Sequence, residues 1–438
     1  MNSLISYLNH WANVQPEQPY ATFLDLHGNV TETYTYRAFN ERTAYVAEYL
    51  FQQVGLKPGE RALLVYPPGL EIIVAFFACA RIGVIPVPVY PPTQNTPAPR
   101  STKLDFIVDD CQPAVALTTS QNSDLSALQC ISTNHLRGKP NETLNHDPHP
   151  ILFLQYTSGS TSDPKGVIVS HENVIHNCFA IADHKPISVS WLPQYHDMGL
   201  IGYYVFTCIS GGATYGFSPA DFLRRPLLWL QTLSRVRATC TSSPNFGFEY
   251  CLREDKIPSA QLAGLDLSSL RVLMNASEPA RPETHRRFLE RFAPYGLRSE
   301  AHIVAYGLAE NTLAVTHRGR RSARFGEREL MSSGAPLAGI HVRIVDPKSG
   351  NALRDGEIGE VWVAGPSTCL GYWNRPQLTE QTFGNSITAN DTDAGRYLRT
   401  GDLGLVDNGE LFICGRIKDL IIVRGVNYYP QDIESAVE

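Results

Sequence analysis

The sequence predicts an α/β fold with helices packed on both faces of largely parallel sheets, followed by a smaller subdomain of antiparallel strands. Strand-like and helical patterns alternate, as in residues 61–66, 71–80 and 84–89, and this strand-helix-strand order builds parallel sheets. From Met331 onward, short strands alternate with turns instead. A chain of 438 residues also exceeds what one hydrophobic core usually supports, so we expect several subdomains.

Composition and charge favour an ordinary globular enzyme. The formal net charge is −6 and no run of Lys or Arg occurs, which argues against nucleic acid or an anionic membrane surface as the main partner. The most apolar stretch, residues 72–90, is interrupted by Arg81, Gly83, Pro86 and Pro88, so no membrane span is expected.

The N-terminus lacks the basic region of a signal peptide. The nine cysteines have no C-x-x-C spacing and predict reduced thiols of a cytoplasmic protein, not zinc ligands.

The first 150 residues continue the alternation of helices and strands. Residues 4–50 have helical periodicity, with strand candidates at 20–24 and 33–36. A helix at 104–111 and a strand at 114–118 follow the first strand-helix-strand unit. Residues 119–150 are polar and rich in Pro and Asn, and predict a surface segment.

Residues 155–167 form the predicted centre of the chain. Apolar runs at 151–154 and 167–169 bracket them, so they predict a loop between two buried strands. Glycine N–H groups, the Lys165 ammonium and several hydroxyls suit phosphate oxygens. The loop residues expected to bind phosphate are Thr157, Ser158, Gly159, Ser160, Thr161 and Lys165. The spacing differs from the Walker loop, and the bracketing strands argue against a disordered Ser/Gly linker.

Later turns follow strand ends, which is where open α/β sheets place ligands. His196 and Asp197 lie in such a turn, although a structural pair is an equally good reading of these two residues alone. Tyr306 offers a ring for stacking on a purine, Gly307 a close backbone approach to phosphate, and Glu310 an oxygen ligand for Mg²⁺. Asp402 follows a glycine, as in an Asx cap, and also suits two ribose hydroxyls.

The remaining segments have predicted structural roles. A helix is expected at 171–182 and a single helix at 218–233. Glu278 and Pro279 are expected in the first turn of another helix. The small and aromatic residues at 245–250 could line an apolar tunnel or merely pack. The arginine-rich residues 317–330 predict a polar, mobile surface segment.

The motif Tyr156–Thr161 with Pro164-Lys165-Gly166 resembles the signature loop of the adenylate-forming enzymes, which include acyl-CoA synthetases and adenylation domains. Further motifs resemble the fatty acyl-AMP ligases of that superfamily, and the likeness covers nearly the whole chain. It implies the large N-terminal domain, with two doubly wound αβαβα-type subdomains and a small distorted β-barrel. The expected subdomains are 1–183, 184–330, 331–415 and a hinge at 416–438, without the C-terminal lobe.

The resemblance also implies roles for particular residues. His196 would flank the reacting carboxylate, and the acyl chain would lie beside Asn245, Phe246 and Gly247. Ala276, Ser277 and Glu278 would place their backbone against adenine. The stretch Ala305, Tyr306, Gly307, Leu308, Ala309 would contact the nucleotide, with Glu310 on Mg²⁺; Ala309 is typical of the fatty acyl-AMP ligases. Asp402 would bind ribose, Arg416 ribose or phosphate, and Lys418 would mark the hinge.

The implied activity is ATP-dependent formation of a fatty acyl-adenylate, with acyl transfer to an acyl carrier protein or a carrier domain of a polyketide or nonribosomal peptide synthase. Two alternatives stay open: a long-chain acyl-CoA synthetase, and a nucleotide-binding module that is inactive without the C-terminal lobe. Four turns, including those that contain Lys165, Tyr306-Gly307 and Asp402, are predicted to converge on one adenosine monophosphate.

Overall fold

The structure is a computed structural model that describes residues 1–91, 102–119, 128–140, 147–157, 163–181, 185–326, 328–387, 395–419, 421–423 and 426–428. The chain divides into two compact units. The first unit contains Met1–Thr239 and Cys369–Pro376, and the second contains Cys240–Thr368 and Gln377–Glu438. The finer division into three subdomains and a hinge stays a prediction.

The first unit holds the elements up to residue 239. They are α1 (Leu4–Val14), β1 (Pro19–Leu24), β2 (Val30–Thr35), α2 (Tyr36–Gln52), β3 (Arg61–Val65), α3 (Glu71–Arg81), β4 (Ile85–Pro88), α4 (Thr102–Cys111), β5 (Val115–Thr118), β6 (Cys130–Ser132), β7 (Ile151–Tyr156), β8 (Gly166–Ser170), α5 (His171–Ile181), β9 (Ile187–Ser190), α6 (Asp197–Gly199), η1 (Leu200–Val205), α7 (Phe206–Ser210), β10 (Ala213–Gly216), α8 (Pro219–Arg224) and α9 (Leu227–Arg235).

Parallel pairing dominates the first unit, as the sequence predicts. Strands β4, β3, β5 and β6 form a parallel sheet in that order, and the helix α3 between β3 and β4 is buried over its whole length. A second set pairs β9, β10 and β1 in parallel, with β2 antiparallel at the edge. Strands β7 and β8, which were expected on either side of the predicted loop, are confirmed as an antiparallel pair. The ends of the predicted loop, at 155–156 and 166–167, belong to these strands, and residues 158–162 lie outside the described residues.

The second unit holds the remaining elements. They are β11 (Cys240–Ser243), α10 (Asn245–Leu252), η2 (Ser259–Leu262), β12 (Val272–Asn275), α11 (Pro282–Phe292), η3 (Ala293–Tyr295), β13 (His302–Gly307), η4 (Ala309–Asn311), β14 (Ala314–Gly319), β15 (Ser322–Phe325), β16 (Arg328–Met331), β17 (Ala335–Pro336), β18 (His341–Val345), β19 (Gly359–Ala364), α12 (Pro376–Phe383), β20 (Leu398–Asp407), β21 (Glu410–Arg416), η5 (Ile417–Asp419), β22 (Ile421–Val423) and β23 (Val426–Tyr428).

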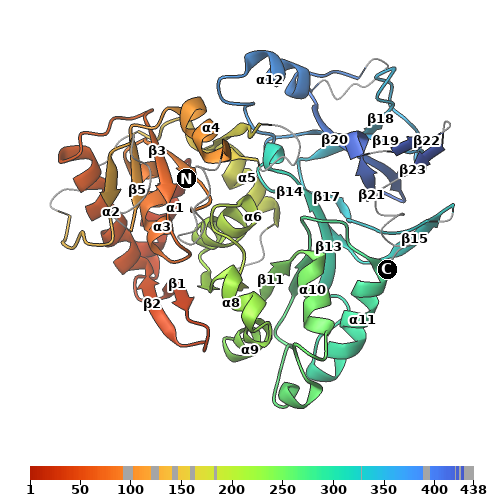
Figure 1. Cartoon of the computed structure of the whole chain (residues 1–438), viewed down its shortest axis with the longest axis horizontal. Helices are drawn as coiled ribbons and strands as arrows, with labels where there is room; N and C mark the ends of the chain where they lie inside the picture. Colours follow the sequence, from red (N-terminus) through yellow and green to blue (C-terminus); the bar gives the residue numbers. More distant parts are fainter. Residues whose placement is uncertain are drawn as a thin grey trace. The chain divides into compact units, whose positions relative to one another are not determined.

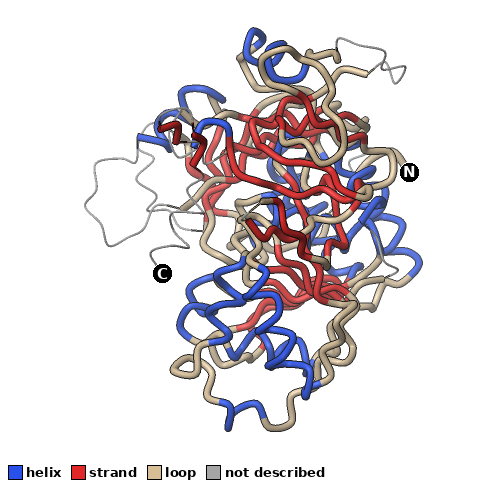
Figure 2. The backbone as a smooth tube through the Cα atoms, turned by 90° about the vertical axis from the view of Figure 1, so that its right-hand side faces the viewer, coloured by secondary structure: helices blue, strands red, loops and turns tan. Residues whose placement is uncertain are grey.

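Two sheets organise the second unit. Strands β11, β12 and β13 are parallel, β14 and β17 extend them antiparallel, and α10 and α11 lie side by side next to these strands (Figure 1). Figure 2 shows the backbone with helices in blue and strands in red. Strands β18, β19, β20 and β21 form the predicted antiparallel subdomain. Within the described residues this sheet is open, with β18 and β21 at its edges, so the expected barrel is not closed.

The single helix expected at 218–233 is wrong, because the chain forms α8 and α9 with a break at Arg225 and Pro226. Proline has no N–H and disfavours helical backbone in the residue before it. Arg225 accordingly adopts φ −143° and ψ 77°, outside the helical region. The proline then sits at the start of α9, where a missing donor costs nothing.

The predicted segment at 317–330 is polar with exposed residues along its described length, as expected, but it forms regular strands, and its mobility stays a prediction. Residues 314–319 complete β14, and β15 and β16 pair as an antiparallel hairpin. The alternate residues Ala323, Phe325 and Leu330 pack on a cluster that includes Phe412. The many arginines obscured this two-residue periodicity.

Three smaller outcomes concern a helix start, the cysteines and membrane spans. The helix expected to contain Glu278 and Pro279 begins later, at Pro282. Seven of the nine cysteines are buried and none is paired in a disulfide. Among the described residues, we find no helix with the length and apolar character needed to cross a membrane.

Candidate active site

The residues Asp163–Gly166, here called the lysine turn, lead into β8. Tyr156 pairs with Gly166 at the end of the hairpin, and the Thr157 N–H donates to the Lys165 carbonyl oxygen at 3.1 Å. Thr157 and Lys165 therefore lie at the base of the predicted phosphate loop. Ser158, Gly159, Ser160 and Thr161 lie outside the described residues.

A distant segment, Gly371–Trp373, pairs with β8 and reaches the lysine turn. The Ile168 N–H donates to Gly371 at 2.9 Å, and the Trp373 N–H donates to Gly166 at 2.7 Å. Between them, the Tyr372 ring lies 5.2 Å from the Lys165 ammonium nitrogen, measured to the ring centroid. This cation–π contact was missed from sequence, since Tyr372 stands more than two hundred residues further along the chain.

Tyr156 braces the lysine turn from inside the hairpin. Its hydroxyl donates to Asp110 Oδ2 on α4 at 2.6 Å, and burial raises the pKa of the Tyr156 phenol, with the Asp110 hydrogen bond adding to the shift. A Cβ atom on Gly166 would lie 2.8 Å from Tyr156 Cζ. Glycine at this position is therefore required by the space that the tyrosine ring takes.

His196 and Asp197 form a contact pair at the start of α6. His196 Nδ1 lies 2.6 Å from Asp197 Oδ1, and the negative charge of Asp197 raises the pKa of His196 above its ordinary value. Asp197 Oδ1 also accepts the Met198 N–H at 2.6 Å, so it supports the turn. The His196 side chain keeps 46% of its surface exposed and can still meet a ligand.

Gln194, in the same turn, was not singled out from the sequence. Its amide accepts from the Gly69 N–H at 2.9 Å and donates to the Gly69 carbonyl oxygen at 2.8 Å. This reciprocal pair ties the His196 turn to the turn that follows β3.

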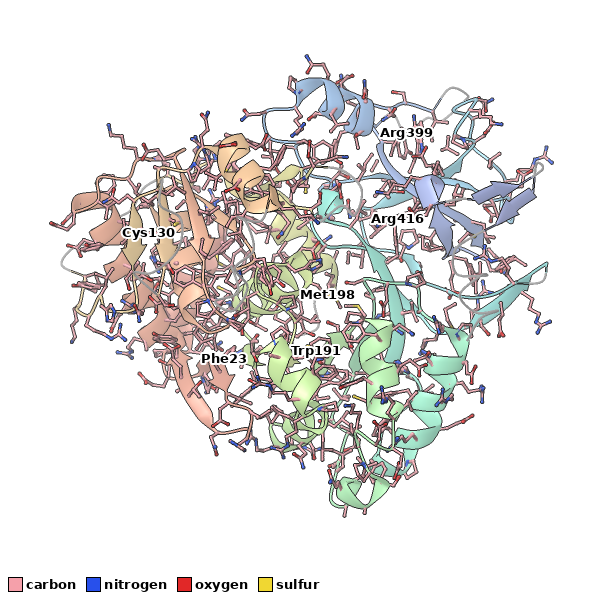
Figure 3. The ribbon with its side chains drawn as sticks, in the orientation of Figure 1. Phe23, Cys130, Trp191, Met198, Arg399 and Arg416 are labelled. Atoms are coloured by element: carbon pink, nitrogen blue, oxygen red, sulfur yellow. The ribbon has the colours of Figure 1, made fainter. Side chains whose placement is uncertain are left out.

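In the second unit, Tyr306, Asp402 and Arg416 come together from β13, β20 and β21. The Tyr306 hydroxyl donates to Asp402 Oδ2 at 2.6 Å, and Arg416 Nε donates to Asp402 Oδ1 at 3.0 Å. Arg416 is one of the labelled side chains in Figure 3. The Asp402 side chain is 8% exposed, and burial raises the pKa of its carboxyl. Burial, followed by the Asp402 charge, also raises the pKa of Tyr306.

Among the described residues, each carboxylate oxygen of Asp402 has one protein donor, which leaves it a further lone pair. It can therefore accept one more hydrogen bond, such as that of a ribose hydroxyl.

The other predicted nucleotide-binding residues of the Tyr306 stretch differ in their burial and packing. A Cβ on Gly307 would lie 1.8 Å from the Leu313 carbonyl oxygen, so the close approach of β13 and β14 already requires glycine here. Glu310 is half-buried in η4, between Ala309 and Asn311. Ala305 is buried in β13 and Leu308 is half-buried just after it.

Ala276, Ser277 and Glu278 form the turn after β12. Ser277 has φ +76°, a backbone conformation that non-glycine residues rarely adopt. Glu278 Oε1 accepts the Phe246 N–H at 2.5 Å, in the first turn of α10. This contact brings the predicted adenine turn next to the predicted acyl residues.

The three predicted acyl residues have different environments. Asn245 is buried, and its Oδ1 accepts from Asn275 Nδ2 at 2.9 Å and from the Arg281 N–H at 3.1 Å, so its carbonyl group already has structural partners. Gly247 is buried, whereas Phe246 is 44% exposed. Their contact with an acyl chain stays a prediction, as does the convergence of the lysine turn with Tyr306 and Asp402. Lys418 is exposed in η5.

The second unit also contains a cavity of about 700 Å³ between α11 and the β15–β16 hairpin. Its lining includes Glu283, Arg286, Glu290, Arg320 and Glu329. None of the predicted site residues that the structure describes lines this cavity.

Comparison with known proteins gives consistent matches. The family model of the AMP-binding enzymes matches residues 8–373. The chain is 37% identical to the medium-chain-fatty-acid–[acyl-carrier-protein] ligase JamA of Moorena producens, with 100% of the chain and 80% of that protein covered. It is equally 37% identical to the long-chain-fatty-acid–AMP ligase FadD26 of Mycobacterium marinum, covering 100% of the chain and 82% of that protein.

Solved structures agree with these sequence matches. A fatty acid AMP ligase from Legionella pneumophila superimposes with a TM-score of 0.87 at 36% identity, covering 100% of this chain and 80% of that one. A fatty acyl-adenylate ligase from L. pneumophila, in complex with acyl adenylate and pyrophosphate, gives a TM-score of 0.86 at 36% identity, covering 100% and 81%. The described α/β architecture is thus similar to that of acyl-adenylate-forming proteins.

Proposed function

Because the chain belongs to the family of AMP-binding enzymes, we propose that it is a fatty acid–AMP ligase, which uses ATP to convert a fatty acid into its acyl-adenylate. A carboxylate oxygen of the fatty acid bonds to the α-phosphorus of ATP, and the bond from that phosphorus to the bridging oxygen of the leaving pyrophosphate breaks. No nucleophile from the protein is needed. Its side chains position the reactants and neutralise charge.

The observation that carries this proposal is the buried Asp402 carboxylate, held by Tyr306 and Arg416. An acceptor-only group with a free lone pair on each oxygen suits a vicinal diol. We assign the two ribose hydroxyls of ATP to Asp402 and the neighbouring nucleotide surface to Arg416. The adenine then lies against the backbone of Ala276–Glu278.

The phosphates are assigned to the lysine turn and to the loop that precedes it. Lys165 and Thr157 supply a charge and a hydroxyl, which are suited to phosphate oxygens. A Mg²⁺ ion fits a single carboxylate, because it takes oxygen ligands and usually keeps waters and substrate phosphates around it. Glu310 would hold that ion, which neutralises phosphate charge when bound. Among the described residues, no cluster of three or more metal-ligating side chains offers a competing site.

The fatty acid is assigned to His196 and to the start of α10. The raised pKa of His196 favours its protonated form, and a cation beside a carboxylate holds that group in place. The exposed Phe246 ring supplies apolar surface for the alkyl chain. We further propose that the acyl group passes to the thiol of an acyl carrier protein, as the name of the JamA ligase indicates for that relative. None of the nine cysteines forms a disulfide, which suits a protein of the reducing cytoplasm.

Direct binding of a non-hydrolysable fatty acyl-adenylate analogue, measured by calorimetry, tests this function without requiring turnover. Asp402→Asn should weaken binding by about tenfold to a hundredfold, since it removes charge from two hydrogen bonds to the ligand. Asp407→Asn is the matched control, because Asp407 lies on the same strand and instead pairs with Arg321 at 2.9 Å. Equal affinity of the wild type and Asp402→Asn would overturn the ribose assignment.

Turnover is tested by pyrophosphate release with MgATP and a series of saturated fatty acids. Holo-carrier protein and free CoA are then compared as acyl acceptors. Acyl transfer to the carrier alone supports the proposal, whereas efficient acyl-CoA formation would instead identify an acyl-CoA synthetase. Binding of the analogue without any pyrophosphate release would identify a nucleotide-binding module.

A further inference from the structure

The Asp402 turn is a bulge in strand β20. Trp362 on β19 lies opposite Arg399 on β20, and Glu360 lies opposite Leu403. The residues Thr400–Asp402, here called the 400–402 bulge, thus oppose the single residue Val361. Gly401 adopts φ +73°, so the bulge contains a left-handed residue. Bulges of this kind re-aim a side chain, which here is that of Asp402.

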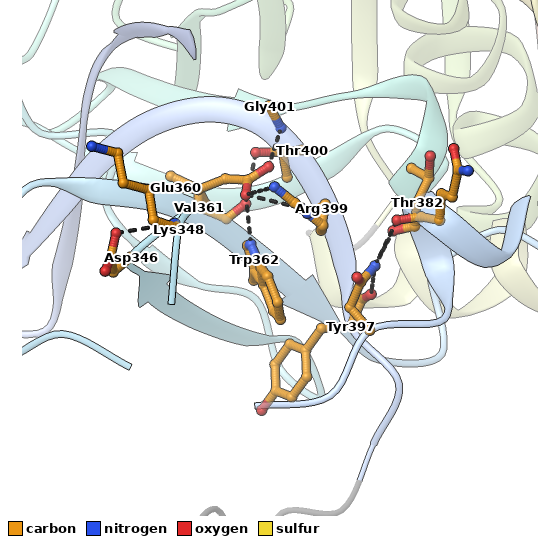
Figure 4. Close-up of polar contacts among 12 residues, drawn as sticks. Asp346, Lys348, Glu360, Val361, Trp362, Thr382, Tyr397, Arg399, Thr400 and Gly401 are labelled. Atoms are coloured by element: carbon orange, nitrogen blue, oxygen red, sulfur yellow. Dashed lines mark hydrogen bonds and ion pairs between the residues drawn. The ribbon is translucent and has the colours of Figure 1, made fainter. Parts of the chain in front are cut away.

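The bulge interrupts the strand ladder, so its backbone donors need other partners. The Gly401 N–H donates to Glu360 Oε1 at 3.2 Å, and the Asp402 N–H donates to Thr400 Oγ1 at 3.1 Å. The Thr400 hydroxyl in turn donates to the Val361 carbonyl oxygen at 2.7 Å. Figure 4 shows the contact between Gly401 and Glu360, with Thr400 and Val361 beside it.

The Glu360 carboxylate is almost inaccessible to water, with 3% of its side chain exposed. Its Oε2 accepts from Trp362 Nε1 at 2.9 Å and from Arg399 Nε and Nη2 at 3.0 and 2.8 Å. A buried charge is tolerated only when such donors replace water. One carboxylate oxygen therefore holds the bulge, and the other is fixed by Trp362 on β19 and by Arg399, which precedes the bulge on β20.

We propose that Glu360 is a positioning residue for the nucleotide: its buried carboxylate holds the 400–402 bulge in the shape that presents Asp402 to the ribose hydroxyls. Glu360 itself does not touch the ligand. This inference rests on the proposed function, because it needs Asp402 to bind ribose. A purely structural role for Glu360 would affect every ligand of the protein equally.

The test compares the affinities of ATP and 2′,3′-dideoxy-ATP by calorimetry in the wild type and in Glu360→Gln. The glutamine amide has only one acceptor oxygen, and its NH₂ group cannot accept a hydrogen bond. The NH₂ group would therefore face either the Gly401 N–H or the Arg399 guanidinium, and the bulge would relax. The wild type should prefer ATP by about tenfold or more, because hydrogen bonds to a charged group are strong. In Glu360→Gln this ratio should fall to about threefold or less, with the affinity for dideoxy-ATP nearly unchanged.

Two further variants complete the design. Glu357→Gln is the matched control, since Glu357 is exposed and accepts only the Arg354 N–H among the described contacts, at 2.8 Å; its ratio should equal that of the wild type. Arg399→Met tests the same network if Glu360→Gln does not fold, because the Arg399 side chain is 38% exposed and easier to remove. Its ratio should also fall.

The outcomes separate this inference from the proposed function. A wild type that binds both nucleotides equally overturns the ribose assignment and the inference with it. A wild type that prefers ATP, together with a Glu360→Gln or Arg399→Met protein that keeps the full preference, overturns only the positioning role. If the variants bind ATP and dideoxy-ATP more weakly by the same factor, the preference for ATP is unchanged, and this result also overturns only the positioning role.

Discussion

The lysine turn and the 400–402 bulge, both assigned to ATP, are held by different interactions. The lysine turn is held mainly through its backbone, by the pairing of β8 with β7 and with the segment Gly371–Trp373. The bulge is held by side chains, through the buried Glu360 carboxylate and the Thr400 hydroxyl. A single side-chain change should therefore damage the bulge far more than the lysine turn.

The glycines of the two turns show the same contrast. Gly166 is required for space, because a Cβ there would lie 2.8 Å from the Tyr156 ring. Apart from the two chain neighbours of Gly401, no described residue has an atom within 4 Å of such a Cβ, so glycine is required here for its φ of +73° instead. One turn is constrained by its neighbours and the other by its own backbone.

The largest expected effect is on the bulge. Glu360→Ala leaves the Arg399 guanidinium, the Trp362 indole and the Gly401 N–H without their acceptor, and should lower the free energy of unfolding by about 2–3 kcal/mol. Glu357→Ala, at an exposed position, should change it by less than about 0.5 kcal/mol. Urea denaturation of the wild type and the two variants measures both values. A loss as small as that of Glu357→Ala would mean that the network contributes nothing to the second unit.

The next effect tests the crowding of the lysine turn. Gly166→Ala should cost about 1–2 kcal/mol, because the Tyr156 ring is pinned to Asp110 and cannot move away freely. The cost should fall by about 1 kcal/mol in a Tyr156→Leu background, since contacting sites are not additive. Denaturation of the two single variants and the double variant gives this coupling. Additive losses would show that the ring is not what excludes a side chain at Gly166.

The corresponding change in the bulge is smaller and should respond differently. Gly401→Ala should cost about 1 kcal/mol through its left-handed backbone alone. Gly401→Asn should cost less, because asparagine visits that region more readily. Truncating a nearby side chain should relieve neither change, because no described residue beyond the two chain neighbours lies within 4 Å of the added Cβ. An asparagine variant less stable than the alanine variant would contradict the backbone explanation.

The sequence predicts the positions of both turns, but not their partners. Apolar runs on both sides located the loop that contains the lysine turn, and the glycine before Asp402 indicated a turn, although not that it is a bulge within a strand. Both are local patterns, and local patterns are what a sequence displays directly. The strand-helix-strand units around β3, α3 and β4 were predictable for the same reason.

The partners of each turn could not be found in this way. Strand pairing brings Tyr372 next to the lysine turn and Glu360 next to the bulge. The periodicity of a sequence predicts which residues are buried, but it does not predict which residues they contact. Glu360 nevertheless left a signal, because it is an acidic residue in an otherwise apolar run at 359–364. A charge in such a run needs a buried partner. The break at Pro226 was equally visible, and the single helix at 218–233 was predicted in spite of it.

The smallest expected effect concerns the one side-chain contact of Lys165 described above. Tyr372→Leu removes the ring that faces the ammonium, and a cation–π contact at a partly exposed site contributes about 0.5–1 kcal/mol. The ring restricts the positions open to the ammonium, so its loss should weaken ATP binding by about threefold. Tyr372→Phe keeps an aromatic ring and should bind ATP almost as the wild type does.

The choice of ligand separates this change from the one at Glu360. Lys165 is assigned to phosphate, so Tyr372→Leu should weaken ATP and 2′,3′-dideoxy-ATP by the same factor and leave adenosine unaffected. Glu360→Gln should instead reduce the preference for ATP over dideoxy-ATP. Calorimetry with the three ligands gives both patterns. If Tyr372→Leu weakened adenosine as much as ATP, the ring would act on the fold of the first unit and not on the lysine, because adenosine has no phosphate for Lys165 to contact.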